Sequence, residues 1–350
     1  MTAVPRIAFR QGYEVSRLIR GGWQLSGDHG EVVPERAIAD MVDFYDAGIT
    51  TFDCADIYAG VEELYGAALK HIANERGKEA AASIRIHTKF VPDYESLSRL
   101  YKADIRRIIE RSAQRLGRER LDLVQFHWWD YSIPGCLDAV AALAELSQEG
   151  LIDRIGVTNF DRKHLVKIVD LVDLVSAQVQ FSLLDRRPMG AFAASAKEHR
   201  VHLICYGALA GGFLTDRWLG RPDPGFDFEN RSLIKYRLII EEFGGWDLFQ
   251  ELLSTLRAIA DRHDADIAAV SVRAMLDHPD ASAVIVGARY ARHLPRLLKS
   301  LQVSLDEADR RAIAELQSRS SGPNGCVYNL ERDKEGRHGR IMKYNLNDVA

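Results

Sequence analysis

Side chains that can donate, accept or orient protons recur along this sequence at the ends of short apolar runs. Four of them could take part in acid–base chemistry, namely Asp53, Tyr58, Lys89 and His127. Further polar groups end later runs: Thr158, Asn159, Gln178, Tyr206 and the Gly-Ala-Arg segment 287–289. Taken singly, each residue is more often a helix cap, a packing tyrosine or a core histidine. Their shared position favours a common polar site.

The apolar runs have the length and composition of β-strands, and longer amphipathic stretches separate them. This alternation is typical of βαβ units with a parallel sheet. The sequence predicts strands at Leu18–Leu25, Thr50–Asp53, Ser83–Lys89, Leu121–His127, Asp153–Val157, Leu174–Gln178, His202–Tyr206 and Ala283–Val286. Eight strands favour an α/β fold of the (β/α)8 TIM barrel type, whose active site lies at the carboxyl ends of the strands. The polar strand ends would then meet at one rim.

The stretches between the strands predict helices. They span Pro34–Ala47, Glu62–Glu75, Ser98–Leu116, Cys136–Glu149, Arg162–Leu171, Gly190–His199, Trp246–Arg262, Asp266–Asp277, Arg292–Ser300 and Leu305–Ser318. Segment Leu214–Gly245 is rich in Gly, Pro and Asp, so we expect an irregular lid or substrate loop there. The tail from Ser321 has no clear periodicity. Its Arg332, Arg337 and Arg340 could fold over the pocket, meet another subunit or remain loosely ordered.

The chain length favours a single domain. A chain of 350 residues with 47% hydrophobic side chains can bury the core of one barrel. We expect this single domain to span residues 1–350, with the barrel at about 15–315 and a C-terminal extension at 319–350. The alternative, a doubly wound open sheet, normally carries G-x-G-x-x-G after its first strand when it binds a dinucleotide. Residues 27–30 (Gly-Asp-His-Gly) lack that pattern, so the barrel is preferred.

Charge and cysteine content exclude several kinds of partner. The 46 basic and 50 acidic residues give a net charge of −4, so neither nucleic acid nor an anionic membrane is indicated. The first residues have no signal-peptide pattern, and no apolar run reaches the roughly 18 residues of a membrane span, so we expect a cytoplasmic protein. Cys54, Cys136, Cys205 and Cys326 are too far apart for a Cys-x-x-Cys pair. We expect neither a disulfide nor a bound metal.

The polar strand ends lie within motifs that resemble those of the aldo-keto reductase family. Segment 48–66 (GITTFDCADIYAGVEELYG) is similar to its signature, in which Asp and Tyr are five residues apart. Segments 86–89 (IHTK) and 121–127 (LDLVQFH) resemble its lysine and histidine strands. Segment 150–160 (GLIDRIGVTNF) resembles its Gly-Val-Ser-Asn-Phe motif, with Thr158 in the serine place. Segments 177–186, 205–212 and 285–289 continue the match, which covers roughly residues 15–315.

The resemblance implies an NADP(H)-dependent oxidoreductase, with NAD(H) as the other possible cofactor, that interconverts a small carbonyl compound and its alcohol. Its catalytic tetrad falls on the four acid–base residues named first. Thr158, Asn159 and Gln178 would bind the nicotinamide amide, and Tyr206 would stack on the nicotinamide ring. The pyrophosphate would lie along Leu209, Gly211, Leu214 and Arg217, and the adenine ribose end along Gly287, Arg289 and His293. His293 and the pair Arg296–Leu297 depart from the family's usual residues, so the preference between NADPH and NADH stays open.

In such a reaction Tyr58 would supply the proton for the developing alkoxide. A positive charge about 4 Å away contributes about 4 kcal/mol at an effective dielectric constant near 20. That is enough to lower a phenol pKa by about three units. We therefore expect Lys89 to lower the pKa of Tyr58 toward neutrality, Asp53 to keep Lys89 charged, and His127 to bind and orient the carbonyl oxygen.

The substrate and two alternative functions stay open at this point. Trp23, Trp128 and Trp129 would line the substrate pocket or simply cover the end of the barrel. The polar groups of Asp28, His29 and Asp130 leave room for a polar substrate. One alternative is a nucleotide-sensing regulatory subunit that keeps the barrel and serves as a binding partner. The other is a metal-dependent hydrolase that uses Asp53 and His127. The sequence gives no indication of the oligomeric state.

Overall fold

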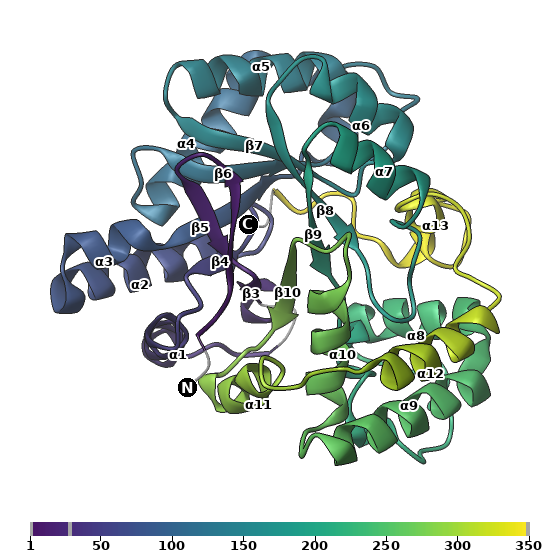
Figure 1. The fold of residues 1–350 in the computed structure, drawn as a ribbon. Coiled ribbons are helices and arrows are strands. Elements are labelled where there is room, and N and C mark those ends of the chain that lie inside the picture. Colours follow the sequence, from purple (N-terminus) through teal and green to yellow (C-terminus); the bar gives the residue numbers. More distant parts are fainter. Residues whose placement is uncertain (1–2, 27–29, 348–350) are drawn as a thin grey trace.

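The central element of the molecule is a closed barrel of eight parallel strands (Figure 1). The computed structural model describes residues 3–26 and 30–347, so Asp28 and His29 lie outside the described residues. The barrel strands are β3 (Leu18–Gly21), β4 (Thr51–Asp53), β5 (Arg85–Phe90), β6 (Leu121–Phe126), β7 (Ile152–Thr158), β8 (Leu174–Gln180), β9 (His202–Tyr206) and β10 (Ala283–Gly287). Pairing between β10 and β3 closes the ring. The predicted (β/α)8 fold is confirmed.

A short antiparallel hairpin that the sequence analysis did not predict closes the amino end of the barrel. It consists of β1 (Arg6–Arg10) and β2 (Tyr13–Ser16). Its side chains Phe9, Tyr13 and Val15 are buried in one cluster with inward residues of the barrel strands. The polar rim is therefore confined to the other end, where the strands end at their carboxyl termini.

Helices lie around the barrel, and most of them bury apolar side chains in one core with its strands. They are α1 (Pro34–Asp46), α2 (Val61–Arg76), α3 (Lys78–Ser83), α4 (Lys102–Leu116), α5 (Cys136–Gln148), α6 (Arg162–Val169), α7 (Ala191–Glu198), α8 (Arg231–Phe243), α9 (Gly245–Arg262), α10 (Ile267–Asp277), α11 (Leu294–Lys299), α12 (Glu307–Ser318) and α13 (Asn329–Arg332). Local signals set several boundaries. Asp266 caps α10 by accepting a hydrogen bond from Ala269 N at 2.8 Å, and α4 ends at Gly117 with φ 62°.

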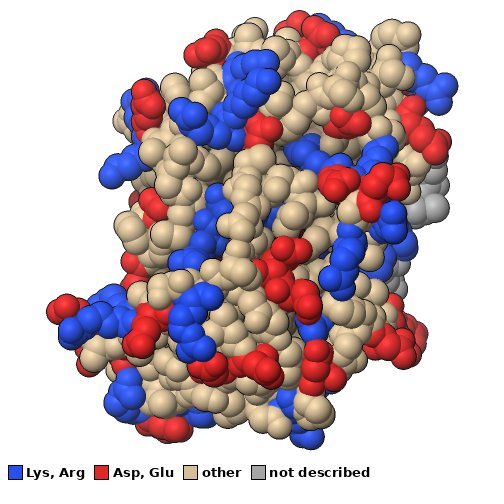
Figure 2. Space-filling view, turned by 90° about the vertical axis from the view of Figure 1, so that its right-hand side faces the viewer, with Lys and Arg blue, Asp and Glu red and all other residues tan. Residues whose placement is uncertain are grey.

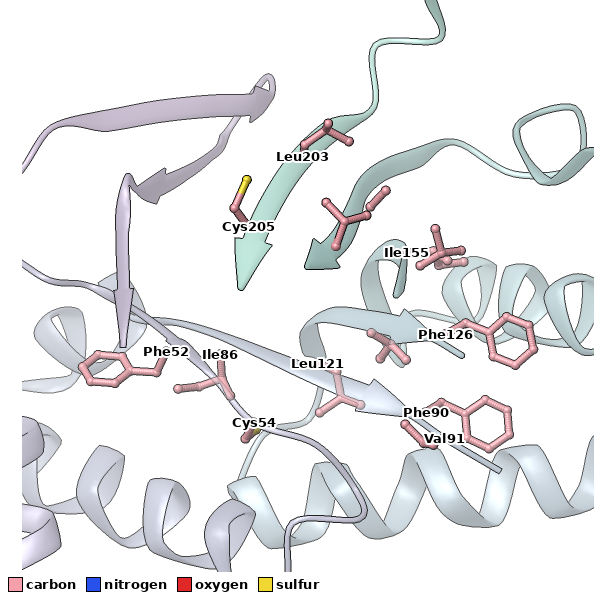
Figure 3. Packing of buried hydrophobic residues seen from close by; sticks show 14 of the residues in the cluster. Phe52, Cys54, Ile86, Phe90, Val91, Leu121, Phe126, Ile155, Leu203 and Cys205 are labelled. Carbon is pink, nitrogen blue, oxygen red and sulfur yellow. The ribbon is translucent and has the colours of Figure 1, made fainter. Parts of the chain in front are cut away.

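The core between strands and helices is continuous around the barrel. Figure 3 shows Phe52, Ile86, Phe126 and Ile155 among its side chains, which come from neighbouring strands. Burying such a side chain completely contributes about 1.5–3 kcal/mol. A second apolar cluster joins α8, α9, α10 and α12 beside the barrel.

Two segments differ from the sequence-based expectation. Segment 214–245 was expected to be irregular, but it contains the 13-residue helix α8. Ile239, Ile240 and Phe243 of α8 are buried in the second cluster, so tertiary packing stabilises this helix. The Gly and Pro residues around it had led us to expect irregular structure. The tail, in yellow in Figure 1, carries α13 and passes close to the carboxyl end of the barrel. Of its three arginines, Arg332 contacts the loops at this end of the barrel, whereas Arg337 and Arg340 are exposed.

The molecular surface has no extended field of one sign on the face drawn in Figure 2, where basic and acidic side chains are interspersed. Among the described helices, none is both long and apolar enough to cross a membrane.

Candidate active site

The strand ends bring the predicted residues to one rim. Asp53 is the last residue of β4, Lys89 lies one residue before the end of β5, and His127 directly follows β6. In the β7–β8 ladder Thr158 pairs with Gln178, and in the β8–β9 ladder Gln180 pairs with Tyr206. The parallel register therefore gathers side chains that are far apart in the sequence.

Lys89 and Asp53 form a buried ion pair at the centre of this rim. Lys89 Nζ lies 2.6 Å from Asp53 Oδ2, and each side chain is only 6% exposed. Lys89 also donates to the carbonyl oxygen of Cys54 at 2.7 Å. Burial alone would lower the pKa of Lys89, but the nearby Asp53 and Tyr58 raise it above its ordinary value, so the ammonium stays charged.

Two amide side chains hold the carboxylate of Asp53 from the other side. Gln178 Nε2 donates to Asp53 Oδ1 at 2.6 Å, and Gln125 Nε2 donates to the same oxygen at 3.2 Å. Gln125 was missed in the sequence analysis. The alternation of strand side chains could have found it, because Gln125 lies two residues before His127 and therefore points to the same face of its strand.

Tyr58 lies in the turn between β4 and α2, beside Lys89. The ammonium is 5.0 Å from the centre of the Tyr58 ring, and the ring of Trp23 is 4.9 Å away on another side. Burial raises the pKa of Tyr58; Lys89 lowers it and Asp53 adds to the rise, so that the result is above the ordinary value. The expected fall toward neutrality is therefore wrong for this structure, because desolvation of the phenolate outweighs the single ammonium. Tyr58 is a protonated phenol at neutral pH.

His127 is buried with one ring nitrogen paired and the other open. Its Nδ1 lies 3.0 Å from the carbonyl oxygen of Thr158, and a carbonyl can only accept, so we assign the proton to Nδ1. Burial lowers the pKa of His127 to about 3, with Arg332 acting in the same direction, so the ring is neutral. Nε2 has no hydrogen-bond partner among the described residues. This buried, unpaired nitrogen can only accept a hydrogen bond, because the ring proton is on Nδ1.

Tyr206 and Asn159, which were predicted to contact the nicotinamide, are hydrogen-bonded to each other. Tyr206 is partly exposed, and its hydroxyl donates to Asn159 Oδ1 at 2.9 Å. Asn159 has φ 62°, a left-handed conformation that asparagine tolerates better than most residues. Its Nδ2 has no partner among the described residues. Thr158 and Gln178 lie beside it, although Gln178 Nε2 is engaged with Asp53.

The segment predicted to bind the pyrophosphate lies under α8. A Cβ on Gly211 would come within 2.5 Å of the Tyr236 ring, so glycine allows α8 to approach this turn closely. Leu209 is partly exposed, but Leu214 is fully buried in the cluster that α8 and α9 form. Arg217 is exposed and lies 5.3 Å from the Trp218 ring.

The predicted adenine ribose end follows β10. Gly287 is exposed at the rim, and the Gln24 side chain lies against it. Arg289 donates to the carbonyl oxygens of Gly30 and Glu31, in the segment between β3 and α1. His293 is exposed, with Nε2 3.5 Å from Arg292 Nε. These residues lie on one side of the barrel mouth, away from the loop that follows His127.

The three predicted pocket tryptophans have different environments. Trp23 contacts Tyr58 and donates through Nε1 to Ser232 Oγ of α8 at 2.9 Å. Trp129 packs edge-on against His127, with ring centres 4.4 Å apart. Trp128 is fully buried and packs against Phe126. The structure thus places Trp128 in the core, and the prediction that it lines the pocket is wrong.

The C-terminal tail completes the mouth. Tyr328 lies edge-on to His127, with ring centres 5.6 Å apart. Arg332 donates to the carbonyl oxygens of Trp129 and Asn159 at 2.6 and 2.8 Å, to that of Trp128, and to Tyr131 Oη. The tail therefore fixes the loops that follow β6 and β7.

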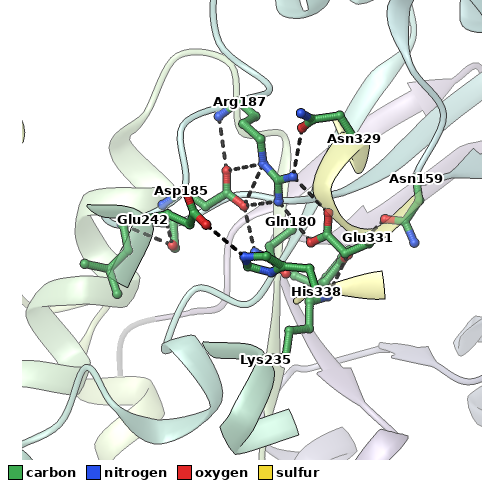
Figure 4. A network of polar contacts seen from close by, with 12 residues as sticks. Asn159, Gln180, Asp185, Arg187, Lys235, Glu242, Asn329, Glu331 and His338 are labelled. Atoms are coloured by element: carbon green, nitrogen blue, oxygen red, sulfur yellow. Dashed lines mark hydrogen bonds and ion pairs between the residues drawn. The ribbon is translucent and has the colours of Figure 1, made fainter. Parts of the chain in front are cut away.

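A buried ionic cluster anchors this tail to the barrel (Figure 4). Arg187 pairs with Asp185 Oδ2 at 2.7 Å and with Glu331 Oε2 at 2.9 Å, and all three side chains are at most 1% exposed. Although burial opposes ionisation, Arg187 lowers the pKa of Glu331 to about 2. The sequence analysis missed this cluster, because Glu331 is 144 residues from Arg187 and no local pattern joins the two.

Comparisons with known proteins identify the family of this chain. The model of the "Aldo/keto reductase family" matches residues 17–318. The chain is 27% identical over 312 residues to "Aldo-keto reductase YhdN" of Bacillus subtilis, covering 86% of this chain and 90% of that protein. It is 24% identical to the "NADH-specific methylglyoxal reductase" of Escherichia coli, covering 86% and 94%. The chain belongs to the aldo-keto reductase family and is an oxidoreductase of the carbonyl/alcohol type.

Solved structures share the fold. A glycerol dehydrogenase from Gluconobacter oxydans superposes with a TM-score of 0.75 at 23% identity, covering 93% of this chain and 98% of that chain. An aldo-keto reductase from Bacillus halodurans, solved in a holo form, gives a TM-score of 0.69 at 24% identity, covering 92% and 96%. At these identities the likeness concerns the fold.

Proposed function

We propose that this enzyme interconverts a carbonyl compound (an aldehyde, ketone or sugar) and its alcohol with NADP(H), using Tyr58 as the general acid and base. The observation that carries the proposal is the rim cluster in which Lys89, paired with Asp53, lies beside Tyr58, while His127 Nε2 is open. The nicotinamide cofactor would supply or accept the hydride at the carbonyl carbon. The protein supplies orientation and the proton.

In reduction, the protonated Tyr58 donates a hydrogen bond to the carbonyl oxygen and transfers its proton as the alkoxide develops. The charged Lys89 stabilises the phenolate left behind, because an adjacent ammonium favours the anion. Asp53 and its two glutamine partners hold Lys89 in place.

His127 would bind the oxygen atom of the alcohol form. With its proton on Nδ1, the neutral ring can accept the O–H of the alcohol through Nε2 while Tyr58 is protonated, and this O–H would turn to the Tyr58 phenolate when the proton is transferred. The carbonyl oxygen then takes its hydrogen bond from Tyr58. His127 is thus an orienting group at neutral pH and does not supply the proton.

The residues around Tyr206 would hold the nicotinamide. The Tyr206 ring would stack on it, and Asn159, Thr158 and Gln178 would bind its amide. Leu209, Gly211, Leu214 and Arg217 remain our candidates for the pyrophosphate, with Gly287, Arg289 and His293 for the adenine ribose end. A relative is named for NADH specificity, so the preference for NADPH has to be measured on this chain.

Fluorescence titration with NADPH and then NADH tests the cofactor. Binding would quench the tryptophan emission and transfer energy to the reduced nicotinamide. We expect the lower dissociation constant for NADPH. Tighter binding of NADH would reverse the cofactor preference, and no binding of either would refute the oxidoreductase mechanism.

A nucleotide-sensing regulatory subunit is the second function considered, and turnover separates it from the first. We expect steady NADPH oxidation with a simple aldehyde, undiminished by strong chelators. Binding without turnover would favour the regulatory function. A loss of activity with chelators would favour a metal-dependent site, although among residues 3–26 and 30–347 no three His, Cys, Asp or Glu side chains are grouped as metal ligands.

A further inference from the structure

Lys235 of α8 reaches into the mouth of the barrel without a carboxylate partner. Its Nζ is 3.4 Å from Tyr206 Oη, which accepts the hydrogen bond because it donates its own hydrogen to Asn159. The ammonium is also 5.0, 5.8 and 5.7 Å from the ring centres of Tyr206, Tyr236 and Tyr328. Within the described part of the chain, no carboxylate oxygen lies within 4.0 Å of it.

The carboxylates in this region are already engaged. Asp53 is paired with Lys89, and Asp185 and Glu331 are both held by Arg187. Figure 4 shows Lys235 beside that cluster, not within its paired core. Arg332 nearby is bound by carbonyl oxygens and a tyrosine hydroxyl, again without a carboxylate among the described residues. The mouth therefore has more cationic than anionic side chains.

This ammonium has no direct carboxylate contact among the described residues, although the cluster of Asp185, Arg187 and Glu331 beside it has one more carboxylate than cations. Ring faces attract it, but an ammonium has three N–H donors, and the long bond to Tyr206 uses one of them. Burial lowers the pKa of Lys235 below its ordinary value; Glu331 and Asp185 oppose this fall and Arg187 adds to it. An anionic oxygen bound to Nζ would supply both a direct charge partner and the missing acceptors.

The position of Lys235 relative to His127 favours the substrate as the source of that anion. Tyr328 contacts both residues, since its ring centre is 5.6 Å from that of His127 and 5.7 Å from Lys235 Nζ. Nζ is nearer to the hydroxyl of Tyr206 than to the ring centre, so it does not sit squarely over the ring face. Tyr328 therefore links the two groups, so a ligand bound at His127 lies near Lys235 as well.

We propose that Lys235 is a specificity-determining residue, which selects carbonyl substrates with an anionic group, a carboxylate or phosphate, on the side of the molecule remote from the carbonyl. This inference rests on the proposed function, because it assumes that the carbonyl binds between Tyr58 and His127. Lys235 itself takes no part in hydride or proton transfer.

A matched pair of aldehydes tests this selection. 4-Carboxybenzaldehyde and methyl 4-formylbenzoate differ in charge but share the ring and the reacting group. We expect kcat/KM with NADPH to favour the acid. In Lys235→Met the acid-to-ester ratio of kcat/KM should fall about 10- to 100-fold, the usual effect of removing a charged hydrogen bond. Lys235→Arg should keep the ratio within about threefold because it keeps the charge.

An exposed lysine supplies the control. Lys70→Met on α2 makes the same chemical change away from the mouth and should leave the ratio as in the unaltered protein. Equilibrium binding of 4-(hydroxymethyl)benzoate and its methyl ester, followed by tryptophan fluorescence, gives the same comparison without turnover. Tighter binding of the acid than of the ester, lost in Lys235→Met, supports the inference even if neither aldehyde is turned over. In that case only the proposed function is refuted.

Three results would overturn the inference while leaving the reductase function intact. The first is turnover of both aldehydes by the unaltered protein without preference for the acid. The second is an unchanged acid-to-ester ratio in Lys235→Met. The third is weaker NADPH binding by Lys235→Met at a constant ratio, which would make the cofactor diphosphate the anion that Lys235 binds.

Discussion

Two buried ionic clusters face the same barrel mouth, and they differ in how completely their hydrogen bonds are satisfied. Arg187 is bonded through Nε, Nη1 and Nη2 to Asp185 and Glu331 at 2.7–3.2 Å, which leaves no room for a ligand. Lys89 and Asp53 are nearly as buried, with side chains 6% exposed, but Tyr58 and the unpaired Nε2 of His127 lie beside them. A cluster whose hydrogen-bonding groups all have partners can anchor the tail. A cluster beside groups without a partner can bind and act on a substrate.

The strongest test of this contrast is Tyr58→Phe. It keeps the ring beside Lys89 and removes the proton, so turnover should fall about 10²- to 10⁴-fold while the dissociation constant of NADPH stays nearly constant. Steady-state kinetics and fluorescence titration measure the two effects. Tyr45→Phe on α1 is the matched control and should keep full activity. Unchanged turnover in Tyr58→Phe would remove Tyr58 from the mechanism.

Breaking the closed cluster should act on stability. Arg187→Met leaves two buried carboxylates without their partner, so the free energy of unfolding should fall by about 3–5 kcal/mol. Urea unfolding measures the loss. Arg319→Met, which breaks an ion pair whose side chains are both 50% exposed, should cost less than about 1 kcal/mol. Equal losses in the two variants would show that the buried cluster is not a special anchor.

The histidine beneath the rim should make stability depend on pH. Burial lowers the pKa of His87 to about 3, with Lys89 and Arg85 acting in the same direction, and neither ring nitrogen has a partner among the described residues. The folded state keeps His87 neutral while the unfolded chain takes up a proton below pH ~6.5, so stability falls as pH falls from ~6.5 toward 3.

The expected loss from His87 between pH 7 and 5 is about 2 kcal/mol, from 1.36 kcal/mol per pH unit below the unfolded pKa. Urea midpoints at the two pH values measure it. His87→Gln should reduce the pH dependence by about that amount. An identical pH dependence in both proteins would show that His87 is protonated in the folded state as well.

The smallest effect is expected at the cofactor surface. Tyr206→Ala removes the stacking face, which is worth about 0.5–1.5 kcal/mol, so the dissociation constant of NADPH should rise about 2- to 13-fold. Tyr206→Phe keeps the ring face and loses only the hydroxyl that donates a hydrogen bond to Asn159. The dissociation constant of NADPH should therefore rise less in this variant. Fluorescence titration of both variants measures these dissociation constants. An unaltered NADPH affinity in Tyr206→Ala would refute the stacking role.

The part of the molecule that sequence reasoning described well is the barrel rim. Strand periodicity and the order of polar strand ends placed Asp53, Lys89 and His127 together before any contact was known. Sequence reasoning failed for Trp128, because a tryptophan that follows a strand can point into the core as easily as toward the end of the barrel. It also failed for the pKa of Tyr58, because the extent of burial cannot be counted from spacing.

By itself, the sequence determined the barrel and the rim, because both follow from local periodicity and from the rule that parallel strands end at one edge. Only the tertiary structure decided what covers the rim. Helix α8 depends on packing against α9, and the tail depends on a pairing of Arg187 with Glu331 across 144 residues. Such long-range contacts have no local signature. They bring Lys235, Tyr328 and Arg332 to the mouth, where the choice of substrate would be made.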